Sequence, residues 1–222
     1  CGLPVVFTRD LKPYKERKVR LLNGAHTLLA AVGLTAGVQT VGGCMGNPAV
    51  SAFLERCLRE EILPHTPGEP AENRLFQAAM LERFANPCLE HRLASISLNA
   101  LSKWRARLLP TLEACAAEGA LPDGILLAFA VQLHGLLFPP PGMETAQSGE
   151  PAEAAAFFET WASALRDGAA SWPAFAEAAA AQAAFWGTDL RRYPALSPTV
   201  AAHLSVLSRQ GLPALLQPYL EV

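Results

Sequence analysis

The sequence has few charged residues and no long uninterrupted run of apolar ones. Charged side chains make up 17% of its 222 residues and hydrophobic side chains 51%, a balance that excludes disorder as the general state. The formal net charge is −2 and no basic stripe is present, so nucleic acid and anionic membranes are poor candidates for the main partner. Apolar stretches such as Gly124–Leu133 fall well short of the roughly 20 residues that a membrane span needs. We therefore expect a soluble protein.

The sequence also lacks a convincing metal or disulfide pattern. It has five scattered cysteines and no C-x-x-C, and Cys88-x2-His91 supplies only two of the three or four ligands that a zinc site needs. We expect no metal, and reduced cysteines in a cytoplasmic protein. The first residues show no signal peptide, and the chain opens on Cys1 instead of methionine. We read the chain as a piece that begins after another segment.

A glycine-rich nucleotide-binding fingerprint is missing as well. The cluster Gly42–Gly46 has neither the required glycine spacing nor a strand before it. It is more typical of a helix terminus followed by a turn.

Apolar residues recur at helical spacing over most of the sequence, and proline and glycine separate the helical segments. Alternation typical of a strand is confined to Leu3–Thr8, and Phe138–Glu150 is expected to be a mobile loop. The pattern predicts one all-α domain over residues 1–222. The predicted helices are Tyr14 to Gly33–Gly37, Pro48–Leu63, Arg74–Phe84, Pro87–Leu109 with a break near Ser95–Leu98, Pro110–Glu118, Asp123–Leu137, Pro151–Asp167, Ser171–Phe185, Thr188–Tyr193, Ser197–Gln210 and Leu212–Tyr219.

The first predicted helix carries a lysine on its apolar face. At 100° per residue, with Lys18 at 0°, one apolar stripe centred near 330° includes Leu21, Leu22, Ala25, Leu28, Leu29 and Val32. His26 then falls at about 80° and Asn23 at about 140°. Burial of the ammonium would lower the pKa of Lys18 and fit it for general base catalysis.

Asn23 and His26 add the other groups that such a site would use. The Asn23 amide could stabilise an alkoxide, and His26 could orient a substrate hydroxyl. Each residue also has an ordinary structural interpretation: Lys18 extending along an apolar surface to water, Asn23 facing solvent and His26 packing against neighbours.

Several segments, in order, resemble the mannitol dehydrogenase family of polyol-specific long-chain dehydrogenases. Lys18-x4-Asn23-x2-His26 matches the family signature, and further similar runs are Glu60–Pro64, Glu82–Pro87 and Ser95–Pro110. The amino-acid sequences of the run around Lys18 and of Ser95–Pro110 are most similar to the branch that interconverts tagaturonate and altronate. The resemblance is motif-rich over Leu3–Leu112 and rests on helical character and length beyond that.

The resemblance implies a role for each matching residue. Lys18 would be the general base, Asn23 would stabilise the developing alkoxide and His26 would contact substrate. Lys103 matches a basic residue that polyol-specific members place in the substrate pocket, whereas an arginine of the mannitol enzymes is replaced by Ser95. A uronate carboxylate needs a cation, which Lys103 or the nearby Arg105 or Arg107 could supply. An ordinary solvated helix face would explain Lys103 and Arg107 about as well.

The resemblance also implies what this chain would need around it. The helical fold would be like the C-terminal domain of 6-phosphogluconate dehydrogenase, and NAD would be bound mainly by an N-terminal Rossmann domain absent from these residues. The implied activity is NAD-dependent interconversion of tagaturonate and altronate, with a sugar acid or polyol as ligand. Two alternatives stay open: a fructuronate reductase or mannitol-type dehydrogenase, and a non-catalytic helical interaction module.

Overall fold

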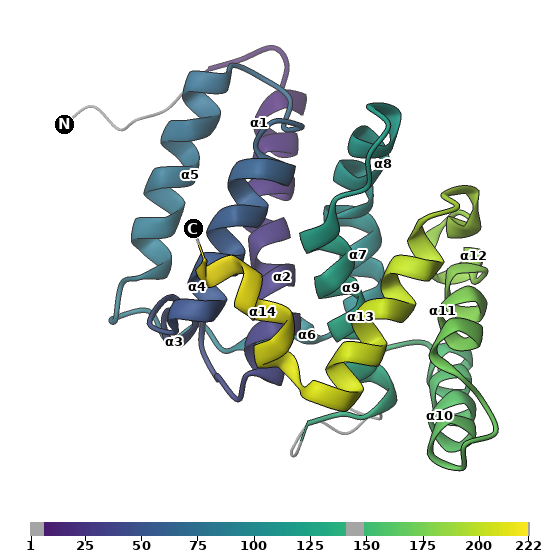
Figure 1. Ribbon diagram of the computed structural model, residues 1–222. Coiled ribbons are helices and arrows are strands. Elements are labelled where there is room, and N and C mark those ends of the chain that lie inside the picture. Colours follow the sequence, from purple (N-terminus) through teal and green to yellow (C-terminus); the bar gives the residue numbers. More distant parts are fainter. Residues whose placement is uncertain (1–6, 141–148, 222) are drawn as a thin grey trace.

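A computed structural model describes residues 7–140 and 149–221, and within them every named element is a helix. Figure 1 shows α5 at one edge, the α1–α2 region beside it, then α7–α9, and α10–α12 at the far edge, with α13 and α14 crossing diagonally. The first half contains α1 (Lys12–Arg17), η1 (Lys18–Asn23), α2 (Gly24–Thr35), α3 (Val41–Met45), α4 (Pro48–Cys57), η2 (Leu58–Ile62), α5 (Pro70–Phe84), α6 (Leu93–Ser97) and α7 (Ala100–Arg107). The second half contains α8 (Leu109–Ala117), α9 (Asp123–Leu137), α10 (Ala152–Arg166), α11 (Trp172–Ala180), α12 (Ala183–Trp186), η4 (Leu190–Arg192), α13 (Leu196–Gln210) and α14 (Leu212–Leu220).

The all-α prediction is confirmed, and so are most helix positions. Prolines begin several helices in the first turn, as at Pro48 and Pro70, where a missing N–H leaves no helical bond unmade. The predicted helix at Asp123–Leu137 has the same bounds in the structure. Two predictions concern segments that are largely undescribed. The strand-like Leu3–Thr8 and the loop Phe138–Glu150 lie mostly within residues 1–6 and 141–148, which are outside the described residues.

The predicted helix beginning at Pro87 is wrong over its first residues, because the next helix, α6, begins only at Leu93. The backbone before it pairs elsewhere: Val41 N–H donates to His91 O, and Leu93 N–H donates to Gln39 O. These bonds surround an antiparallel bridge between Thr40 and Arg92. Because the backbone of this segment is held by residues 39–41, it does not continue a helix.

The prediction of a helix end and turn at the glycine cluster 42–46 is confirmed: the cluster lies in the short helix α3, capped by Thr40 Oγ1 accepting from Gly43 N–H, and Gly46 follows that helix in a turn. One further helix prediction needed correction. The helix expected over Ser171–Phe185 is divided into α11 and α12. The division follows from Trp186, whose buried indole donates to Ala179 O at 2.7 Å and so brings the chain back against α11.

The core joins the two halves of the chain through α9. Helix α9 packs against α2, α4, α10 and α13, and most of its residues are buried. Trp104 of α7 stacks on Phe129 of α9 at a centroid distance of 4.3 Å, and Trp186 contacts both rings edge-on. These three side chains are at most 1% exposed, so they fix α7 against α9. Helix α7 carries the three basic candidates of the sequence.

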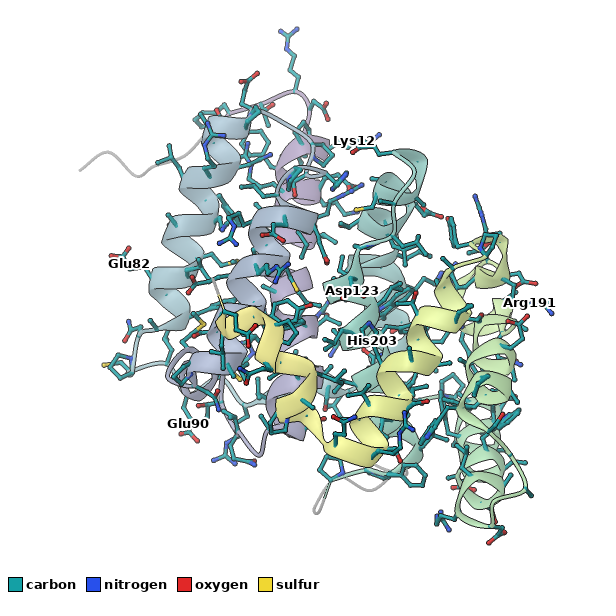
Figure 2. The ribbon with its side chains drawn as sticks, in the orientation of Figure 1. Lys12, Glu82, Glu90, Asp123, Arg191 and His203 are labelled. Atoms are coloured by element: carbon teal, nitrogen blue, oxygen red, sulfur yellow. The ribbon has the colours of Figure 1, made fainter. Side chains whose placement is uncertain are left out.

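A polar contact also ties α9 to α13. The Asp123 carboxylate lies 3.0 Å from Nε2 of His203, and Figure 2 shows the two labelled side chains on facing parts of these helices. Among the described residues, no helix is both long enough and apolar enough to cross a membrane.

Candidate functional site

The Lys18-x4-Asn23 motif forms a π-helical turn between two α-helices. In η1 the hydrogen bonds span five residues, as in the bond from Gly24 N–H to Val19 O. Because one more residue is enclosed per turn, each residue rotates through roughly 80° instead of 100°. Asn23 then lies about 40° from Lys18 around the axis, instead of about 140°. Three α-helical residues later, His26 lies about 20° to the other side of Lys18.

This turn therefore aligns the three candidate residues on one side of the helix. Single π-helical turns within α-helices occur frequently at functional sites. Periodicity at 100° per residue had spread Lys18, Asn23 and His26 over an arc of about 140°. With the π turn they share an arc of about 60°.

The prediction that Lys18 is buried is wrong, because its side chain is exposed. The apolar stripe itself is confirmed, with Leu21 fully buried. The π turn moves Lys18 to about 120° from Leu21, where an α-helix would keep it at about 60°. Lys18 consequently points away from the core.

His26, in contrast, is half-buried between two rings. Its ring centroid lies 4.6 Å from that of Phe84 and 4.8 Å from that of His91, the latter edge-on. Burial, then the nearby charges of His91 and Arg107, lower the pKa of His26 to about 4. At neutral pH the imidazole is therefore uncharged, with one nitrogen able to donate and the other able to accept.

The lowered pKa of His26 makes stability depend on pH. In the unfolded chain His26 becomes protonated as the pH falls below 6.5, whereas in the folded chain it stays uncharged down to about pH 4. The associated stability is full above pH 6.5 and is lost as pH falls to 4. We expect a loss of up to about 3 kcal/mol, reduced by solvent screening of this half-buried ring.

Urea unfolding of the wild-type chain and of His26→Leu at pH 7.0 and pH 4.5 measures this effect. Leucine keeps the contact with Phe84 and removes the titrating group. The wild type should lose more stability than the variant over this interval. Equal losses in the two proteins would contradict the lowered pKa of His26.

Helix α7 brings one cation, Arg107, into contact with the end of η1 and the start of α2, and carries a second, Lys103, one helical turn away. Arg107 donates through Nη1 to Thr27 Oγ1 at 3.2 Å and to Asn23 O at 3.5 Å. Lys103 donates through Nζ to Ile96 O at 2.8 Å. Both side chains are half-buried, and burial lowers the pKa of each, for Lys103 with a further contribution from Arg107. Glu150 favours the charged form of Lys103.

The third basic candidate of α7 lies elsewhere. Arg105 is exposed, and its guanidinium occupies the space beside Gly187, the cap of α12. Lys103 and Arg107 are four residues apart and share a side of the helix, whereas Arg105 between them does not. Ser95, where the mannitol enzymes carry arginine, is exposed.

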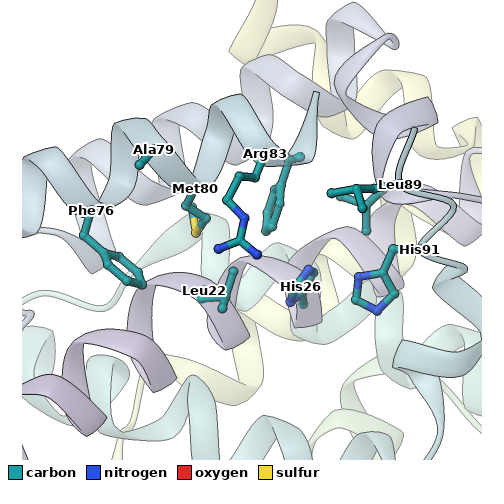
Figure 3. Close-up of a pocket in the computed structure, with 10 residues that line it drawn as sticks. Leu22, His26, Phe76, Ala79, Met80, Arg83, Leu89 and His91 are labelled. Atoms are coloured by element: carbon teal, nitrogen blue, oxygen red, sulfur yellow. The ribbon is translucent and has the colours of Figure 1, made fainter. Parts of the chain in front are cut away.

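A cleft of about 390 Å³ opens between the η1–α2 helix and α5, and of the candidate residues only His26 lines it. His26 and Leu22 form its floor, and Arg83 projects from α5 toward them (Figure 3). Its other lining residues are mainly apolar: Val41, Phe76, Ala79, Met80, Phe84 and Leu89. His91 closes one end in the loop after α5, where its ring meets His26.

Arg83 and His91 were missed as site neighbours in the sequence. Arg83 belongs to the run Glu82–Pro87, which was noticed only as a resemblance. His91 was considered only as a metal partner of Cys88, which is exposed. Among the described residues, no three His, Cys, Asp or Glu side chains are grouped to hold a metal ion.

The described residues do not fit NAD as a ligand of this part alone. A dinucleotide's diphosphate is commonly bound at a glycine-rich turn between a strand and a helix. Over residues 7–140 and 149–221 there is no strand, only the bridge of Thr40 with Arg92. The glycine cluster at 42–46 lies in and just after α3.

Comparisons with known proteins agree with this arrangement. The family described as "Mannitol dehydrogenase C-terminal domain" matches residues 10–207. The chain is 36% identical over 217 residues to altronate oxidoreductase of Klebsiella pneumoniae, covering 97% of this chain and 45% of that protein. It is 35% identical over 220 residues to altronate oxidoreductase of Bacillus subtilis, covering 99% of this chain and 44% of that protein. The chain thus spans less than half the length of these relatives.

A solved structure shares the fold. Pseudomonas fluorescens mannitol 2-dehydrogenase, in a ternary complex with NAD and D-mannitol, superposes with a TM-score of 0.78 at 20% sequence identity. The match covers 97% of this chain and 42% of that one. The helical fold of these residues is therefore shared with a part of that dehydrogenase.

Proposed function

This chain belongs to the mannitol dehydrogenase C-terminal domain family, and from that membership we propose that it is the substrate-binding, proton-transferring part of an NAD-dependent oxidoreductase that interconverts tagaturonate and altronate. The observation that carries the proposal is a half-buried cation in contact with the motif, with a second half-buried cation on the same helix. Arg107 contacts Asn23 O and Thr27, and Lys103 lies one helical turn away on the same side of α7.

Such a pair of cations suits a carboxylate. A substrate carboxylate can accept charge-assisted hydrogen bonds from a guanidinium and an ammonium, which are stronger than bonds between neutral groups. A neutral polyol gains little from two partly desolvated cations. A sugar acid therefore fits this side of the site better than mannitol does, in agreement with the relatives named altronate oxidoreductase.

The motif residues would handle the reacting hydroxyl. In the oxidative direction, Lys18 Nζ in its uncharged form takes the proton from the substrate hydroxyl. The Asn23 amide donates to the oxygen as its negative charge develops, and uncharged His26 holds a hydroxyl of the substrate. In the reductive direction, Lys18 returns the proton to the oxygen of the former carbonyl group.

The nicotinamide would be held by a Rossmann domain in the complete protein. Support comes from the lengths of the relatives and from the lack of a diphosphate site in the described residues. When bound, NAD supplies the hydride acceptor of the oxidation. Cys44, Cys57, Cys88 and Cys115 are free thiols, which suits the reducing cytoplasm that we propose for the enzyme.

A substrate panel on the complete protein tests this assignment. We expect NADH oxidation with tagaturonate to exceed that with fructose by about 10²-fold or more in kcat/KM, because fructose leaves the cation pair unmatched. Fructuronate keeps a carboxylate and tests the stereochemistry of the site. A preference for fructose would defeat the uronate assignment. No oxidation with any of the three would favour a non-catalytic helical module.

A further inference from the structure

The turn that carries Lys18 has few apolar anchors of its own. Within η1, Leu21 is the only fully buried residue, and Lys18 itself is exposed. A π-helical turn is also uncommon, and it occurs mostly as a single turn within an α-helix. A base that must meet a substrate hydroxyl at hydrogen-bonding distance needs a fixed backbone. Besides the apolar packing of Leu21 and Leu22, polar contacts anchor η1.

Arg17, the residue before Lys18, provides one anchor. Its Nε donates to Asn73 Oδ1 at 2.7 Å, and its Nη2 lies 2.6 Å from the Glu72 carboxylate. Asn73 is 1% exposed, and its Nδ2 donates to Thr66 O at 2.9 Å and to Pro67 O at 3.3 Å. The Arg17 side chain is 12% exposed. This chain of bonds ties the start of η1 to the first turn of α5.

Arg20, two residues after Lys18, provides a second anchor in another direction. Its Nη1 donates to His65 O at 2.9 Å and to Pro110 O at 3.3 Å, while its Nε lies 3.4 Å from the Glu16 carboxylate. His65 follows η2, and Pro110 lies in the first turn of α8. The Arg20 side chain is 13% exposed. Its two carbonyl partners are 45 and 90 residues away in sequence.

We propose that Arg17 and Arg20 are positioning residues that hold the π-helical turn and thereby set the place of Lys18. The two guanidinium groups flank Lys18 in sequence and bind separate parts of the fold: α5 for Arg17, and the segment after η2 together with α8 for Arg20. The proposal rests on the proposed function, because it acts through Lys18 as the base. Neither arginine is assigned a contact with substrate.

Glutamine variants of the two arginines test the proposal in the complete protein. In Arg17→Gln and in Arg20→Gln we expect kcat for tagaturonate reduction to fall by about 10-fold to 100-fold, because misplacement of a reacting group by about 1 Å has that effect. KM should change by no more than about threefold, since the binding cations on α7 are untouched. Arg59→Gln is the matched control: Arg59 is an exposed arginine of η2 that pairs with Glu60, and kcat should be unchanged.

Lysine variants separate positioning from a general loss of structure. Lysine keeps the charge but cannot reproduce two directed guanidinium bonds, so kcat should follow the order arginine, lysine, glutamine at position 20, with the melting temperature of Arg20→Lys near that of the wild type. Wild-type kcat in both Arg17→Lys and Arg20→Lys would overturn the proposal, even where a glutamine variant fails to fold.

The double variant with Lys18→Ala shows whether the arginines act through Lys18. If they do, adding Arg20→Gln to Lys18→Ala lowers the residual rate no further. Fully additive losses would overturn the positioning role. Normal turnover in Lys18→Ala would instead remove the proposed base, whereas an inactive Lys18→Ala beside fully active arginine variants would remove only the positioning inference.

Discussion

Replacing Lys18 with alanine in the complete protein should lower the rate of tagaturonate reduction by about 10²-fold to 10⁴-fold, the contribution of a well-placed general acid–base group. The variant keeps the proposed alkoxide donor Asn23 and the half-buried cation Arg107, so substrate binding should change little. Because Lys18 is exposed in the described structure, its removal opens no cavity and should leave the melting temperature unchanged.

The measurement pairs single-turnover kinetics with NADH binding followed by fluorescence. Lys15→Ala is a matched control, because Lys15 is an exposed lysine of α1 one helical turn before Lys18. NADH affinity should be the same in both variants, and only Lys18→Ala should lose turnover. A Lys18→Ala protein that reduces tagaturonate at the wild-type rate would remove Lys18 from the mechanism.

Much of the helical fold could be predicted from the sequence because helix boundaries are local. Proline in a first turn and apolar spacing of 3.6 residues place the helix Asp123–Leu137 and the starts at Pro48 and Pro110. The error at Pro87 arose where bonds to residues 39–41 decide the backbone, some 50 positions away along the chain. Such pairings carry no local periodic signal.

The candidate site shows the same division between local and distant information. The residues of the motif were found from their chemistry and resemblance, but their directions were miscalculated because a π turn looks like an α-helix in an apolar pattern. The exposure of Lys18 and the common side shared with Asn23 both follow from that extra residue. Arg107 could be proposed only as one of three basic residues, since its bond to Thr27 spans 80 positions.

In the proposed function, this helical domain would work together with a separate domain that holds the cofactor. Lys18 is exposed on one side of its helix, where the cofactor's domain could cover it. Arg107 and Lys103, in contrast, are half-buried and hydrogen-bonded within this domain. Substrate charge would then be recognised by preformed groups, and the proton-transferring amine would meet the cofactor's domain. Binding and chemistry should respond differently to substitution.

Arg107→Met should therefore weaken tagaturonate binding far more than it lowers the turnover rate of bound tagaturonate. Methionine retains an apolar stem on α7 but removes the guanidinium, so the carboxylate loses a charge-assisted pair in a partly desolvated place. We expect kcat/KM for tagaturonate to fall by about 30-fold to 100-fold, mostly through KM, from the 2–3 kcal/mol that such a hydrogen bond to a charged group contributes. The rate with fructose should fall much less.

Arg105→Met is the control for this loss, because Arg105 occupies the same helix but lies beside Gly187. It removes the same charge from the domain and should leave kcat/KM within about twofold, as expected for an exposed residue far from the ligand. Steady-state kinetics with tagaturonate and fructose on both variants give a two-by-two comparison. Equal losses with the two substrates in Arg107→Met would show that Arg107 only holds Asn23 and Thr27 in place. A loss confined to tagaturonate identifies it as the residue that recognises the carboxylate.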